Sequence, residues 1–143
     1  MIKSTEILKE VIIPHTKGDK LKVLVTGGAG FIGSHLAEGL LDRGHDVRVL
    51  DNLSSGNIEN LNKCEDNDSF RFIKGDIRDI EDVKSAVRCV DAIFHEAAIT
   101  SVPVSVDNPD LTNGVNVEGT LNLLEEAMNQ GVKRFVFASS CAV

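Results

Sequence analysis

The segment that most constrains the fold is the glycine-rich stretch VLVTGGAGFIGSH at residues 23–35. An apolar run ends at Thr26, four of the next seven residues are glycine, and apolar residues then recur at helical spacing. Glycine loses more backbone entropy on folding than any other residue, so such a cluster indicates positions that need a positive φ or a bare Cα. The segment therefore predicts a strand, a tight turn that another group approaches closely, and a helix.

The change between apolar runs and helical spacing continues along the chain. Helices are predicted at 31–44, 79–87 and 113–130, whereas the polar segment 52–69 and the proline-containing segment 100–110 are predicted to be loops. The strands are expected to be buried on both faces, because their apolar residues are continuous rather than alternating. The pattern predicts an α/β fold, a doubly wound parallel sheet of the Rossmann-like type that ends after the fifth strand. The predicted strands are LKVLVTG (21–27), VRVLD (47–51), FRFIKGD (70–76), a strand around 91–94, and RFVFAS (134–139).

The chain is expected to have two parts. Residues 1–20 are predicted to form an N-terminal extension with a short amphipathic helix at 2–13, and residues 21–143 form the folded domain. His35 is predicted to lie on the core face of the first helix and His95 at the end of the fourth strand, so both are expected to be structural. In the helix predicted at 113–130, one face carries Val117, Leu121, Leu124 and Met128.

The composition argues against several functions. The formal net charge is −7, from 15 basic and 22 acidic residues, which disfavours nucleic-acid binding. No apolar run reaches the roughly 20 residues that cross a membrane. The three cysteines Cys64, Cys89 and Cys141 fit neither a zinc site nor a disulfide framework. No metal is expected, and a reducing cytoplasm is favoured.

The glycines fit a dinucleotide site. In a doubly wound sheet the first turn between strand and helix faces a ligand's pyrophosphate, with free N–H groups and the positive end of the helix dipole. Gly28, Gly30 and Gly33 match the GxGxxG spacing in the context that this motif requires. Asp51 follows at the end of the second strand, where a carboxylate binds the adenosine ribose and repels a 2′-phosphate, which favours NAD over NADP. The alternative is that Asp51 only caps a turn.

Two further strand ends contribute to this site. Asp76, in KGDIRD, is placed to reach the adenine amino group, and the alternative is that it caps the following helix. Ala97 and Ala98 are small enough to let the backbone lie along the cofactor, although alanines at a strand end also serve packing alone.

Taken together, the motifs resemble a known family. TGGAGFIGSH, LDNLSSG, KGDIRD, HEAA, SVPVS, NVEGTLNLLEEA and RFVFASS follow the order and spacing of the extended short-chain dehydrogenase/reductases. The chain is most similar to the nucleotide-sugar epimerase and dehydratase branch, and above all to its UDP-glucose 4-epimerase-like members, over about residues 21–143. The resemblance implies NAD as cofactor, a nucleotide sugar such as a UDP-hexose as substrate, and reversible hydride transfer at hexose C4.

The resemblance also assigns individual residues. It implies that Ser140 is catalytic and contacts the substrate, that Ser101 lies near the hexose, and that Asn116 lies near the cofactor or in helix packing. The cofactor would be bound by Gly27, Gly30, Phe31, Ile32 and Gly33 at the pyrophosphate, Asp51, Asn52, Ser55 and Gly56 at the adenosine ribose, Asp76 and Ile77 at adenine, and Ala97 and Ala98 along its length.

One departure from the family is large. The family's general base is a tyrosine in a YxxxK motif after the fifth strand, and the chain contains no tyrosine. It is therefore expected to be an N-terminal portion, inactive alone, of a longer enzyme. The resemblance also implies a possible homodimer of the full-length protein, paired through a bundle of the helix at 113–130 and the helix after the fifth strand. A 4,6-dehydratase or decarboxylase is an alternative, although Cys141 and Ala142 after Ser140 favour an epimerase. A non-catalytic dinucleotide-binding sensor is the alternative from another class.

Overall fold

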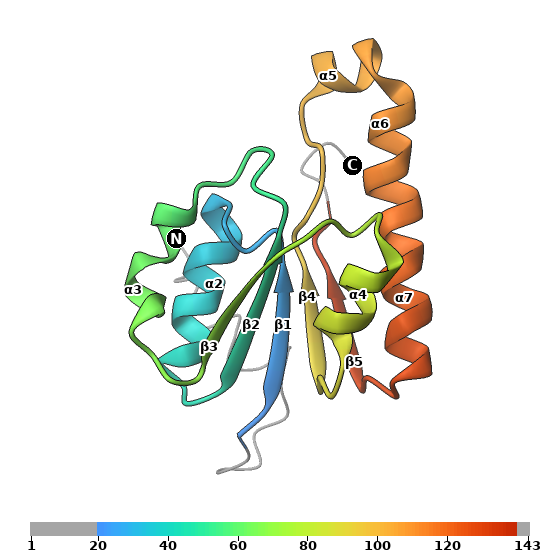
Figure 1. Cartoon of the computed structure of the whole chain (residues 1–143). Coiled ribbons are helices and arrows are strands. Elements are labelled where there is room, and N and C mark those ends of the chain that lie inside the picture. Colours follow the sequence, from blue (N-terminus) through green and yellow to red (C-terminus); the bar gives the residue numbers. More distant parts are fainter. Residues whose placement is uncertain (1–19, 140–143) are drawn as a thin grey trace.

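The computed structural model describes residues 20–139. Its centre is a five-stranded parallel sheet in the order β3-β2-β1-β4-β5, which confirms the doubly wound topology (Figure 1). The strands are β1 (Lys22–Thr26), β2 (Asp46–Asp51), β3 (Phe70–Lys74), β4 (Ala92–His95) and β5 (Arg134–Phe137). The helices are α2 (Phe31–Leu41), η1 (Ile58–Leu61), α3 (Asn62–Glu65), α4 (Ile80–Val87), α5 (Val102–Asp107), α6 (Pro109–Asn113), the π-helical segment η2 (Gly114–Gly119) and α7 (Thr120–Asn129).

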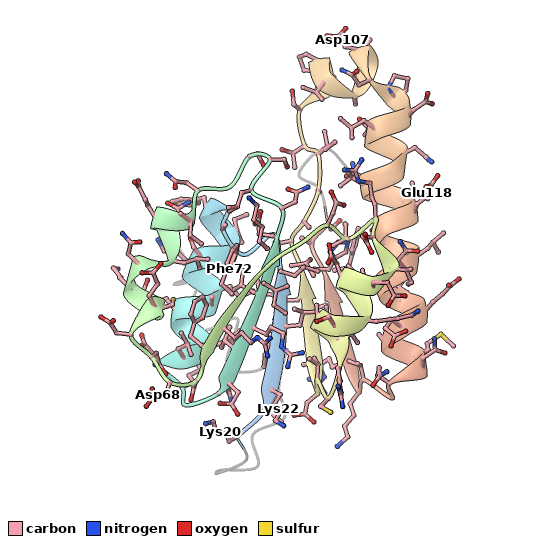
Figure 2. All side chains as sticks on the ribbon, viewed as in Figure 1. Lys20, Lys22, Asp68, Phe72, Asp107 and Glu118 are labelled. Atoms are coloured by element: carbon pink, nitrogen blue, oxygen red, sulfur yellow. The ribbon has the colours of Figure 1, made fainter. Side chains whose placement is uncertain are left out.

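Helices cover the sheet on both sides because successive side chains of each strand point to opposite faces. Val23 and Val25 of β1 pack into a cluster with α2 and α3, whereas Leu24 packs into a second cluster with α4 and α7. Figure 1 shows these two layers, with α2 and α3 on one side and α4 and α7 on the other. Since the strands are parallel, their carboxyl ends lie along one edge, at the opposite end of the molecule from Lys22 in Figure 2.

Two segments predicted as loops contain helices. In 52–69, Leu61 and Cys64 are buried against the α2 cluster, and this tertiary packing supports η1 and α3 despite their polar sequence. In 100–110, the prolines lie in the first turn of α5 and of α6, where the missing N–H costs no helical hydrogen bond. The side chain of Ser101 caps α5. The loop predictions for these helical parts are therefore wrong.

The helix predicted at 113–130 is longer than expected. From Pro109 to Asn129 the chain is continuously helical through α6, η2 and α7 (Figure 1). Its inner side carries Leu123 and Ala127, and a Cβ on Gly119 would lie 2.6 Å from side-chain carbons of Ile77. The apolar face formed by Val117, Leu121, Leu124 and Met128 points outward, and Met128 is 81% exposed.

The position predicted for His35 is wrong. The buried face of α2 is formed by Gly33, Ser34, Ala37, Leu40 and Leu41, and His35 lies on the outer side. There its Nδ1 is 2.8 Å from the carbonyl oxygen of Phe31, one turn earlier, and the two rings are in contact.

Some predictions lie outside the described residues. They are the helix at 2–13, the remainder of the N-terminal extension up to residue 19, and Ser140 with the residues after it. Between residues 20 and 139, no helix has the length and apolar character needed to cross a bilayer.

Candidate functional site

A cleft of about 420 Å³ opens at the carboxyl edge of the sheet. In parallel α/β sheets ligands bind at this edge, where the strand order reverses between β1 and β4. The cleft is lined by the loop after β1, by the ends of β2, β3 and β4, and by α5, α6 and η2 above them. Of the predicted site residues, it is lined by Gly27, Gly30, Asp51, Asn52, Ser55, Gly56, Asp76, Ile77, Ala97, Ala98 and Ser101.

The glycine loop meets both of the needs inferred from the sequence. Gly27 has a φ of +67°, and a Cβ there would lie 2.6 Å from the backbone nitrogen of Ala97. Gly30 differs, because the nearest protein atom to its Cβ within 4 Å would be the Gly27 carbonyl oxygen at 3.2 Å. Gly27 is thus required by the protein's own packing, whereas the bare Cα of Gly30 leaves space in the cleft.

The same loop presents an uncapped helix end. Gly30 is the N-cap of α2 and provides no side-chain hydrogen bond. The first turn of a helix has N–H groups without intrahelical acceptors, here those of Phe31, Ile32 and Gly33. With the helix dipole, these N–H groups favour an anion such as a phosphate. The site therefore fits the pyrophosphate of a dinucleotide, although these three residues border the cleft rather than line it.

Asp51 combines a structural and a ligand-facing position. It is 9% exposed, and its Oδ2 accepts a hydrogen bond from Ala29 N at 2.9 Å, while Oδ1 accepts one from Leu53 N at 2.8 Å. Asp51 therefore does cap the turn after β2, as the alternative interpretation predicted. A carboxylate has about four lone-pair sites, so two remain for ligand hydroxyls in the cleft.

Asp76 is bound by its neighbours more tightly than the sequence indicates. Its carboxylate accepts from Asn52 Nδ2 at 2.9 Å and forms a salt bridge of 2.7 Å with Arg78. The Arg78 hydrogen bonds hold the pKa of the Asp76 carboxyl well below its usual range. The alternative role for Asp76, capping the next helix, is wrong, because Asp79 caps α4 by accepting from Glu81 N at 2.9 Å.

Asn116 contributes to the cleft indirectly, by holding the backbone of a residue that lines it. Its amide accepts from Ile99 N at 2.8 Å and donates to Ile99 O at 2.9 Å, so both of its polar atoms bind one backbone residue. It does not line the cleft. Of the two positions predicted for it, the structure favours packing: Asn116 fixes the segment after β4 against η2.

His95 belongs to the core, as predicted. It is 2% exposed, with Nδ1 at 2.7 Å from Thr26 Oγ1 and Nε2 at 2.9 Å from Thr120 Oγ1. Because Thr120 donates its own hydroxyl hydrogen to Asn116 O, the network assigns the proton of a neutral imidazole to Nε2. Burial lowers the pKa of His95 to about 4.

Sequence reasoning missed part of the cleft wall. Arg78 and Glu96 line it, and burial raises the pKa of Glu96. Both lie beside predicted residues in KGDIRD and HEAA, so proximity to those motifs was the available signal. Val104 was missed because α5 was predicted as loop, and Leu111 was missed because it lies between the predicted loop at 100–110 and the predicted helix at 113–130. Across residues 20–139, no group of three His, Cys, Asp or Glu side chains is arranged to bind a metal ion.

Comparisons with known proteins identify a family. Residues 23–143 match the profile of the NAD dependent epimerase/dehydratase family. The chain belongs to this family. It is 47% identical over 121 residues to the UDP-glucose 4-epimerase of Mycolicibacterium smegmatis, covering 84% of this chain and 39% of that protein. The chain spans under two-fifths of the length of this protein and of the related enzymes of Methanocaldococcus jannaschii and Erwinia amylovora.

Solved structures show the same partial coverage. The UDP-glucose 4-epimerase of Thermus thermophilus in complex with NAD is 48% identical, with a TM-score of 0.76, and covers 84% of this chain and 38% of its own. The UDP-N-acetylglucosamine 4-epimerase of Methanobrevibacter ruminantium M1, in complex with UDP-N-acetylmuramic acid, is 41% identical, with a TM-score of 0.81 and coverages of 87% and 39%. The resemblance found in the sequence is confirmed, and the chain corresponds to the cofactor-binding portion of such enzymes.

Proposed function

We propose that this chain binds NAD as the N-terminal portion of a UDP-hexose 4-epimerase. The observation that carries the proposal is the combination of an uncapped α2 N-terminus, the space at Gly30 and the buried carboxylate of Asp51 in one cleft. These groups match two linked phosphates and an adjoining ribose diol. The family's NAD dependence and the 4-epimerases among its relatives support the same assignment.

Each predicted residue has a role in this proposal. The N–H groups of Phe31, Ile32 and Gly33, with Gly27 and Gly30, bind the pyrophosphate. Asp51 accepts from the ribose hydroxyls, Asp76 accepts from adenine, and Asn116 positions the backbone of the segment after β4. The remaining contacts are Asn52, Ser55 and Gly56 at the ribose, Ile77 at adenine, Ala97 and Ala98 along the cofactor, and Ser101 near the hexose.

In this proposal the cofactor supplies hydride acceptance at hexose C4 and its return to the opposite face. The protein binds and orients the cofactor, and Val104 of α5 and Leu111 of α6 contribute apolar side chains to the cleft wall. Ser140 hydrogen-bonds the C4 oxygen, by resemblance alone, since it lies outside the described residues. No tyrosine is present among the 143 residues to remove the C4 hydroxyl proton. We therefore expect cofactor binding by this chain without epimerisation.

The ribose assignment is tested by calorimetric titration with NAD and NADP. Asp51→Ala should raise the Kd for NAD at least about tenfold, because hydrogen bonds to a charged group contribute about 1.5–3 kcal/mol. The substitution should also reduce the preference for NAD over NADP, since a 2′-phosphate is no longer repelled by a carboxylate. Asp68→Ala is the matched control, because it removes an exposed carboxylate at the end of the molecule opposite the carboxyl ends of the strands (Figure 2). Titration curves that are unchanged by Asp51→Ala would refute the assignment.

Substrate and reaction require the full-length protein. Incubation with UDP-glucose or UDP-N-acetylglucosamine should show inversion at C4 by NMR. A 4-keto-6-deoxy product would instead identify a dehydratase, and absence of turnover by full-length protein that binds NAD would favour the sensor alternative.

Assembly and location complete the proposal. The outward apolar face of Val117, Leu121, Leu124 and Met128 supports a homodimer, since such stripes mark interaction surfaces. Leu121→Glu should lower the sedimentation-derived mass of full-length protein while leaving NAD affinity intact, and an unchanged mass would exclude this face as the dimer interface.

The free thiols of Cys64 and Cys89 support a cytoplasmic location.

A further inference from the structure

The carboxylate of Asp76 is saturated before any ligand arrives. Oδ1 accepts from the backbone N of Arg78 at 2.9 Å and from Arg78 Nε at 3.0 Å. Oδ2 accepts from Arg78 Nη2 at 2.7 Å and from Asn52 Nδ2 at 2.9 Å. These four donors fill the roughly four lone-pair sites of a carboxylate. A purine amino group can therefore bind Asp76 only if one donor leaves.

Arg78's guanidinium is the donor that can leave. Asn52 is fixed, because its Oδ1 accepts from Ser54 N at 2.9 Å, and the backbone N–H of Arg78 belongs to the turn itself. The Arg78 side chain is 43% exposed, and within residues 20–139 its hydrogen bonds all go to Asp76. An ion pair that faces solvent is held weakly, since water replaces it at little cost.

We propose that Arg78 and Asp76 together bind the substituent at position 6 of the purine, so that the cleft accepts dinucleotides with either a 6-amino or a 6-oxo purine. The inference rests on the proposed function, since it needs the purine beside Asp76. A 6-amino group donates to Asp76 after the guanidinium turns to solvent. A 6-oxo group accepts from Arg78, which has five N–H donors and uses only Nε and Nη2 on Asp76. With either ligand bound, the Asp76 carboxylate still accepts hydrogen bonds at both oxygens.

The test compares NAD with nicotinamide hypoxanthine dinucleotide, which carries a 6-oxo purine, by calorimetric titration. Arg78→Met keeps the apolar stem but removes every side-chain donor. It should strengthen NAD binding several-fold, because the competitor for Asp76 is gone. It should weaken binding of the hypoxanthine analogue, because its oxygen now faces a bare carboxylate. We expect the ratio of the two Kd values to change about tenfold or more.

Lys74→Met is the matched control, because it removes one positive charge from an exposed residue two positions before Asp76. It should leave the ratio unchanged. AMP and IMP should reproduce the change for Arg78→Met, which places the effect at the purine. Equal weakening of both dinucleotides by Arg78→Met, or an unchanged ratio, would overturn the inference while leaving the proposed function intact. Native protein that binds neither dinucleotide would overturn both.

Discussion

The buried imidazole of His95 predicts how the stability of the protein depends on pH. Burial lowers the pKa of His95 from 6.5 to about 4, so the unfolded chain binds a proton in this range that the folded chain does not. Stability should therefore be fully present above pH 6.5 and fall as the pH drops toward about 4. At about 1.4 kcal/mol per tenfold difference in proton affinity, the loss is about 3 kcal/mol.

The contacts of His95 support this sign. The groups that face it are the hydroxyls of Thr26 and Thr120 and the rings of Phe135 and Phe137, none of which carries a charge that would stabilise an imidazolium. A protonated Nδ1 would also take away the hydrogen-bond acceptor of Thr26.

Denaturant titrations across this pH range measure the effect. His95→Gln removes the titrating group, so its unfolding free energy should fall less on acidification than that of the native protein, with the difference approaching about 3 kcal/mol. Two other groups also change the free energy of unfolding with pH. The raised pKa of Glu96 makes stability increase on acidification, and the lowered pKa of Asp76 makes stability decrease below pH 3.8. Both groups are present in the native protein and in His95→Gln, so their effects cancel in the comparison. His35→Gln removes an exposed imidazole and serves as control. Parallel profiles for native protein and His95→Gln would refute the reasoning.

Other substitutions separate packing from ligand binding. Gly27→Ala should destabilise the protein by more than about 2 kcal/mol through its positive φ and the clash with Ala97, seen as a lower denaturant midpoint. Gly30→Ala should change stability by less than about 1 kcal/mol yet raise the Kd for NAD about tenfold. Equal losses of stability in Gly27→Ala and Gly30→Ala would contradict the assignment of Gly27 to packing and of Gly30 to the cleft. Asn116→Ala should cost about 1–3 kcal/mol and speed amide exchange at Ile99, whose unaltered protection would argue against the positioning role.

The sequence predicted the positions of the strands well because each is a short, mainly apolar run between turn residues. Arg48 and Arg71 interrupt two of these runs, and β3 and β5 are less buried than expected. The glycine loop and Asp51 were also found, since their spacing carries a mechanism that depends on local sequence. The helices η1 and α3 were not, because the burial of Leu61 and Cys64 decides their formation and leaves no periodic pattern. The helices α5 and α6 were missed because their prolines indicated a loop, although each proline lies in a first helical turn.

The electrostatic detail of the cleft was equally beyond the sequence. KGDIRD places Asp76 at a strand end, but only the folded turn shows that Arg78 occupies its carboxylate and that Asp79 performs the capping. For His35, helical spacing could not distinguish the inner from the outer side of α2, because Phe31 and Ile32 are apolar and yet exposed, Phe31 by 78%.

The close packing of Gly119 against Ile77 has a consequence for communication across the molecule. Ile77 lines the cleft, and its carbonyl oxygen also accepts a hydrogen bond from Asn122 Nδ2 at 3.1 Å, so η2 holds this residue by contact and α7 holds it by polar bonding. A subunit that docks on the outer side of α7 would therefore be separated from the bound nucleotide by a single helix and one isoleucine. A rotation of that helix large enough to displace Ile77 would change the shape of the cleft wall.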